Sequence, residues 1–119
     1  MTTPDPLAAV RSRRSDTCTG IDVPPGWVPL MTELDAALVT VTPDIRYEQI
    51  KAKYAELRVY VSGRNDAARD LIAAAEIASR NICESCGAAG TTYQSPHGWY
   101  RALCADHAAA DGYTVVANP

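Results

Sequence analysis

The chain contains no phenylalanine, and its aromatic bulk comes from six tyrosines and two tryptophans. Each of these rings carries a polar atom that needs a partner when it is buried, so the core has to be built partly from amphipathic side chains. The chain also has no run of eighteen apolar residues. Because a helix needs about twenty to cross a bilayer, this absence excludes a membrane-spanning helix.

A segment with the pattern of a secretory signal is also missing. The N-terminus has no basic stretch followed by an apolar one, so we expect a cytoplasmic protein in a reducing compartment, where disulfides are rare. Cys18 lies in a polar stretch with no recognisable base or helix start beside it, and we interpret it as an incidental thiol.

The size and charge of the chain limit what it can bind. With 119 residues and 47% apolar content, it can bury one modest core, which predicts a single domain. Its net charge of −3 is a poor electrostatic match for a phosphate backbone. Arg11, Arg13 and Arg14 form a local basic cluster, but the Pro, Ser and Thr around them predict a mobile arm over residues 1–25.

Two pairs of metal-ligand residues stand out in the C-terminal third. Cys83 and Cys86 have C-x-x-C spacing, and Cys104 and His107 follow with C-x-x-H spacing. Together they predict one tetrahedral Zn²⁺ site, and four protein ligands leave no open position for catalysis, so the zinc is expected to be structural. His97 is the alternative fourth ligand, although only His107 repeats the spacing of the first pair.

Hydrophobic periodicity predicts two core helices. The first starts near Trp27 and places Leu34 and Leu38 on its buried face, with Asp35 on its exposed face. The second runs from about residue 66 to Arg80 after a turn that can cap it. In this helix Glu76 and Arg80 are spaced to form an ion pair.

Residues 45–61 have two interpretations. Apolar residues from Tyr47 to Val61 recur at helical spacing, whereas residues 57–61 alternate in the manner of a half-buried strand. In the zinc module, at about residues 81–112, short β-prone runs flank a turn at residues 95–98, and a helix follows from Cys104. A knuckle, a hairpin and a ligand-bearing helix form a treble-clef-like arrangement, and residues 113–116 are expected to add an edge strand.

Several sequence segments together carry a family resemblance. They are Gly26-Trp27-Val28-Pro29-Leu30, Leu34-Asp35, Pro43-Asp44, residues 51–60, CESCG and Gly98-Trp99-Tyr100-Arg101-Ala102-Leu103-Cys104. Over residues 26 to about 108 the chain resembles small uncharacterised zinc-knuckle proteins of actinobacteria and their phages. The resemblance implies strand-turn-strand for residues 45–61, although Tyr54-Ala55-Glu56 replaces the aromatic-Gly-Gly turn of the relatives. We therefore predict an α+β domain over residues 26–119 with two core helices, a β-hairpin and the treble-clef-like zinc module.

Three classes of function can be compared. Treble clefs underlie some metal-dependent nucleases, but beyond His97 the residues for catalysis are missing, and we expect no enzyme activity. A nucleic-acid-binding protein would use the basic residues Lys51, Lys53 and Arg58. We favour a zinc-stabilised protein-interaction module, because Tyr, Trp and Arg dominate binding hot spots. Its candidate anchors are Tyr93, Trp99, Tyr100 and Arg101. The resemblance implies a phage or bacterial accessory factor that modulates a host protein.

Overall fold

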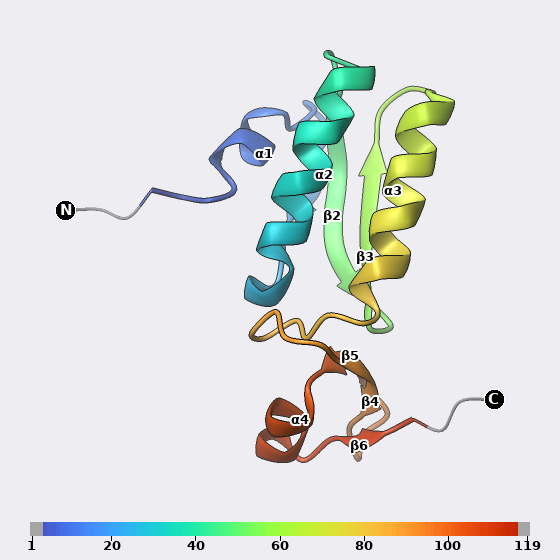
Figure 1. Cartoon of the computed structure of the whole chain (residues 1–119). Helices are drawn as coiled ribbons and strands as arrows, with labels where there is room; N and C mark the ends of the chain where they lie inside the picture. The colour runs from blue at the N-terminus through green and yellow to red at the C-terminus, as the bar shows by residue number, and fades with distance from the viewer. Residues whose placement is uncertain (1–3, 117–119) are drawn as a thin grey trace.

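The computed structural model describes residues 4–116 (Figure 1). Its elements are α1 (Ala8–Ser12), β1 (Gly20–Ile21), the 3₁₀ helix η1 (Pro25–Trp27), α2 (Val28–Val41), β2 (Tyr47–Lys53), β3 (Glu56–Val61), α3 (Asp66–Ser79), β4 (Thr91–Gln94), β5 (Tyr100–Leu103), α4 (Ala105–Asp111) and β6 (Thr114–Val115). The strands form two sheets, ordered β1-β2-β3 and β5-β4-β6. The predicted α+β class with one compact domain is confirmed.

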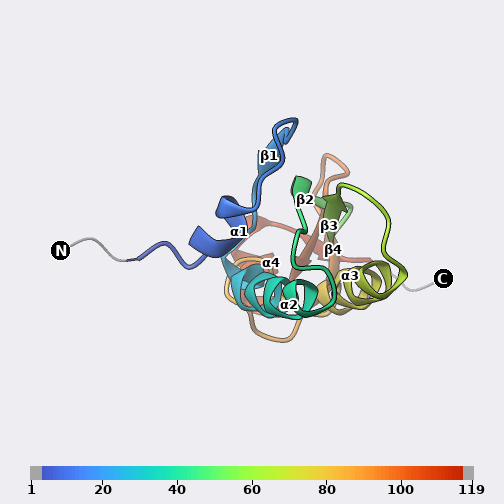
Figure 2. The ribbon, with the colours of Figure 1, turned by 90° about the horizontal axis from the view of Figure 1, so that it is seen from above.

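Two long helices cover one face of the first sheet. In Figure 2, α2 and α3 lie on the same side of β2 and β3. Helix α2 buries Leu34 and Leu38 as its periodicity predicts, and α3 begins where the Asn65 side chain accepts a hydrogen bond from the Ala68 N–H at 2.9 Å. Both predicted helices are confirmed. Within residues 4–116, no helix is long and apolar enough to cross a membrane.

Residues 47–61 form a β-hairpin, which confirms the strand interpretation and excludes the helical one. Strands β2 and β3 pair antiparallel, with Ile50 opposite Val59 and Lys53 opposite Glu56. The side chains of Ile50, Leu57 and Val59 are buried under the helices. The connecting residues Tyr54 and Ala55 both have positive φ angles, 51° and 65°, so the turn takes the left-handed form that matches strand twist.

The predicted N-terminal arm is wrong for residues 4–25, while residues 1–3 lie outside the described part. Leu7, the N-cap residue of α1, and Val10 within the helix are buried in the core, and β1 pairs in parallel with β2. Arg13 forms an ion pair with Asp35, which is buried although the periodicity of α2 places it on the exposed face. The segment was misassigned because its helix and strand are too short to show periodicity.

A second correction concerns the end of α3. Arg80 forms an ion pair with Glu56 of β3, where the sequence predicted a pair with Glu76. The Glu76 carboxylate instead accepts a hydrogen bond from the Val59 N–H at 3.0 Å, and Ser79 Oγ accepts one from the Leu57 N–H at 2.8 Å. Side chains of α3 thus occupy N–H groups of an edge strand that would otherwise invite pairing with another chain.

The C-terminal elements form a smaller unit beside this layer (Figure 1). The predicted hairpin β4–β5 is confirmed, β6 adds the predicted edge strand to β4, and α4 ends at Gly112 with φ 74°. Two hydrogen bonds join the unit to η1, which directly precedes α2: Gly26 N–H donates to the Glu84 carbonyl at 2.7 Å, and the Trp27 indole N–H donates to the Ile82 carbonyl at 2.8 Å.

Candidate metal centre

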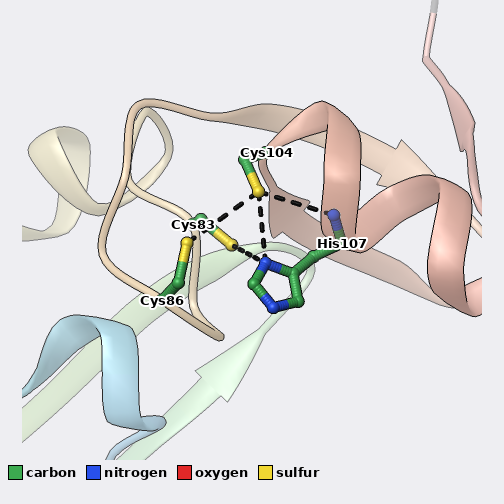
Figure 3. A group of neighbouring side chains, drawn as sticks. All are labelled: Cys83, Cys86, Cys104 and His107. Carbon is green, nitrogen blue, oxygen red and sulfur yellow. Dashed lines mark hydrogen bonds between the residues drawn. The ribbon is translucent and has the colours of Figure 1, made fainter.

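Four potential metal ligands come from two local turns (Figure 3). Cys83 and Cys86 lie in the loop after α3, where the Gly87 N–H donates to the Cys83 carbonyl at 2.8 Å and Gly87 has φ 83°. This left-handed position favours glycine, because a side chain there is strained. Cys104 is the N-cap residue of α4, and His107 lies in its first turn. Each ligand pair is therefore held by its own short backbone turn.

The ligand atoms of these four side chains all lie within 4.8 Å of one another. Cys86 Sγ is 3.8 Å from Cys104 Sγ, and His107 Nδ1 is 3.8 Å from Cys83 Sγ and 3.2 Å from Cys104 Sγ. In a tetrahedral zinc site, bonds of about 2.3 Å to sulfur and about 2.0 Å to nitrogen separate the ligand atoms by about 3.5–3.8 Å. These three separations are close to those of a bound site, and the four side chains could hold a metal ion.

Cys83 is the most buried of the four ligands. Burial raises the pKa of its thiol, but the N–H groups of Cys104, Cys86 and Ser85 outweigh that effect, and together they lower the pKa to about 6. Since the thiolate is the form that binds metal, both ligand-bearing turns favour coordination by Cys83 near neutral pH.

His97 and Cys18 lie apart from the centre. Among residues 4–116, the group of Cys83, Cys86, Cys104 and His107 is the one whose Cys, His, Asp or Glu ligand atoms come close enough to share an ion. His97 is exposed in the turn between β4 and β5, and Cys18 is a partly exposed free cysteine before β1. The alternative in which His97 replaces His107 is therefore not supported.

Comparison with protein-family models, curated proteins and solved structures gave no match. The function has to be inferred from the side chains around the metal centre.

Arg101, a predicted partner anchor, is engaged within the chain. Its guanidinium donates to the Glu84 carboxylate at 2.7 Å, to Ser85 Oγ at 3.0 Å and to the Asp111 carboxylate at 2.9 Å. Glu84 and Ser85 lie between Cys83 and Cys86, and Asp111 is the last residue of α4. Arg101 thus ties β5 to both ligand-bearing turns, a structural role that its sequence position did not reveal.

Beside the metal centre, the tips of the two hairpins β2–β3 and β4–β5 form a cavity of about 470 Å³, which we call the hairpin cleft. It is lined by Lys51, Ala52, Lys53, Tyr54, Ala55, Glu84, Gly98, Trp99, Tyr100, Arg101 and Tyr113. Tyr54, Trp99 and Tyr100 are exposed by 72%, 70% and 38%, and the rings of Tyr54 and Tyr100 meet edge to face at 6.3 Å. Three large aromatic side chains therefore remain accessible in one place.

The hairpin cleft unites residues that the sequence placed in two separate candidate sites. Lys51 and Lys53 come from the basic set, and Trp99 and Tyr100 from the aromatic set. Tyr54 was not predicted from the sequence as a site residue, although its position in the turn of the predicted hairpin indicates an exposed side chain.

The remaining candidates lie elsewhere. Tyr93 is partly buried against the small core that contains Cys83. Arg58 stands opposite Lys51 on the same face of the sheet, but it pairs with Glu56 and lines a different cavity of about 570 Å³ between β3 and α3.

Proposed function

We propose that this protein is a zinc-stabilised interaction module that binds a partner protein through the aromatic residues of the hairpin cleft. The observation that carries the proposal is the exposure of Tyr54, Trp99 and Tyr100 around one cavity. Exposed aromatic side chains that surround a concave site are typical of binding hot spots. With the sequence resemblance, this favours a bacterial or phage accessory factor that acts on a host protein.

The metal in this proposal is zinc with a structural role. Three thiols and an imidazole are a donor set that zinc prefers, and four protein ligands complete a tetrahedron. Elemental analysis of purified protein is expected to give one zinc per chain. Cys86→Ser and His107→Ala are expected to lower the zinc content, while the matched control His97→Ala retains it. Zinc-free folded protein, or zinc retained in both ligand variants, would contradict the assignment.

The interaction can be tested by expressing tagged protein in the organism it comes from and identifying the proteins that are captured with it. Capture of a specific protein by the wild type, its loss with Trp99→Ala and its persistence with Ile77→Ala support the proposal. Ile77 is the matched control because it is a large apolar residue, 56% exposed, on α3. Equal capture by both variants contradicts the assignment of the hairpin cleft as the binding surface.

Nucleic-acid binding is the second candidate, favoured by the shared sheet face of Lys51, Lys53 and Arg58. A complex formed with phosphates weakens steeply as salt rises, because counterions are released on binding. Captured material that disappears after nuclease treatment, together with such a salt dependence, would favour this candidate over a protein partner.

A further inference from the structure

The hairpin cleft is positively charged within a negatively charged chain. Lys51 and Lys53 line it, and neither forms an ion pair with residues 4–116. The acidic residue of its lining, Glu84, is already paired with Arg101. With a net charge of −3 for the whole chain, the two lysines are a local departure that favours an anionic occupant.

The spacing of the lysines suggests the shape of that occupant. Lys51 and Lys53 are alternate residues of β2 and project from the same face, about 7 Å apart. Carboxylates on alternate residues of an extended peptide have the same spacing. For the peptide residues between these carboxylates, the hairpin cleft also offers the aromatic side chains of Trp99 and Tyr100.

Tyr54 adds evidence that the cleft is a binding site. Its φ of 51° is a conformation in which asparagine or glycine is usual, and its ring is 72% exposed, so core packing does not explain a tyrosine there. The Lys53 ammonium lies 5.6 Å from the centre of that ring. Departures from local preference concentrate at functional sites.

The ring geometry favours a peptide over single-stranded nucleic acid. Successive bases stack on aromatic faces, but the planes of Tyr54 and Tyr100 cross at 70° and do not offer parallel platforms. Two unpaired lysines can also neutralise only about two phosphates, which gives little of the electrostatic free energy that such complexes need.

Building on the proposed function, we infer that the hairpin cleft binds an extended peptide segment in which acidic and apolar residues alternate. The acidic side chains pair with Lys51 and Lys53, and the apolar side chains contact Trp99, Tyr100 and Tyr54.

The test uses the zinc-loaded full chain and a fluorescently labelled peptide in which glutamate alternates with leucine. Two control peptides carry the same residues in separate blocks, or lysine in place of glutamate. Saturable binding of the alternating peptide, about tenfold or more tighter than either control, is expected because only that pattern brings acidic groups to the lysines and apolar side chains to the aromatic rings at alternate positions. No saturable binding, or equal binding of the block peptide, overturns the inference.

Variants locate the binding on the protein. Lys51→Glu combined with Lys53→Glu is expected to weaken binding about tenfold or more, and Trp99→Ala several-fold, since these remove the charge and aromatic contacts. Arg64→Glu and Ile77→Ala are the matched controls, because both residues are exposed and lie outside the cleft. Unchanged binding in the double lysine variant contradicts the inference, as does tighter, steeply salt-dependent binding of an oligothymidine. If the peptide fails while cellular capture still depends on Trp99, the peptide chemistry is wrong and the proposed function stands.

Discussion

Asp35 is a single residue that holds three elements together. Its carboxylate accepts two hydrogen bonds from the Arg13 guanidinium, at 3.0 and 3.1 Å, and one from the Tyr47 hydroxyl at 2.6 Å. Both Asp35 and Tyr47 are buried. Burial, followed by the hydrogen bond to Asp35, raises the pKa of Tyr47, so this hydroxyl stays protonated and donates. The N-terminal segment, α2 and β2 therefore share one polar cluster.

Replacing Asp35 should be costly. Asp35→Ala leaves the Arg13 charge and the Tyr47 hydroxyl without their partner in a mostly buried site, and we expect a loss of about 3 kcal/mol in the free energy of unfolding. Urea denaturation measures this loss. The control is Arg69→Ala, which removes a highly exposed ion pair with Asp66 and should cost less than about 1 kcal/mol. Equal losses in the two variants would show that Asp35 is not a structural centre.

Among single residues, the sequence identifies those whose partners lie close along the chain. Cys83 with Cys86, and Cys104 with His107, are each three residues apart, and each pair sits in one turn. Asp35 and Arg13 are separated by 22 residues, and nothing in either local pattern links them. The grouping of the four metal ligands was predictable because metal sites constrain spacing, whereas an ion pair in the core does not.

Among the elements, length decided what could be predicted. Helices α2 and α3 have 14 residues each, enough to show a buried stripe. Helix α1 has 5 residues and β1 has 2, and both depend on contacts with distant parts of the chain for their position. Periodicity left the hairpin β2–β3 ambiguous because its apolar residues fit both periods. The family resemblance favoured strands, and the burial of Ile50 and Val59 under the helices confirms them.

The β2–β3 turn provides a prediction that separates stability from binding. Tyr54→Asn places a residue that tolerates positive φ at the first turn position, and this gain offsets the lost contact with the Tyr100 ring. We expect the free energy of unfolding to change by less than about 0.5 kcal/mol, while binding to the alternating glutamate and leucine peptide weakens several-fold. Denaturation and peptide titration of the same variant test both parts. A large loss of stability would instead mean that the ring supports the fold.

The junction between η1 and the metal-binding loop leaves no room for a side chain at Gly26. A Cβ atom there would lie 1.9 Å from the Cys83 carbonyl oxygen and 2.7 Å from the Gly87 nitrogen, and both are backbone atoms that cannot turn aside. We expect Gly26→Ala to lower the free energy of unfolding by about 2 kcal/mol and to weaken metal binding, because relief of the clash must displace the loop. Thermal denaturation and competition with a chelator measure the two effects, with the exposed neighbour Pro25→Ala as the control. Unchanged metal affinity would show that the loop moves freely against η1.

In the molecule as a whole, the metal-binding unit and the helical layer share backbone contacts. Gly26 N–H bonds to the Glu84 carbonyl, and Glu84 N–H in turn bonds to the Ala102 carbonyl at 2.9 Å. Ala102 itself belongs to the main core, whereas Cys83, Leu103 and Ala108 form a separate small cluster. That small cluster is too limited to hold the second unit without help, and a metal ion bound by the four ligands would supply it.

Removal of the metal should therefore have a graded effect along the chain. With a chelator, we expect amide hydrogens of residues 83–112 to lose protection first, followed by that of Gly26, because its hydrogen bond ends on this loop. Strands β2 and β3, whose core side chains are covered by α2 and α3, should keep their protection. Peptide binding should be lost at the same time, since one wall of the hairpin cleft is the β4–β5 turn. Hydrogen exchange resolved along the chain, run beside the peptide titration, measures both effects. Equal loss of protection in β2 and β3 would mean that the metal supports the whole domain, and full peptide binding without metal would place the binding surface outside the cleft.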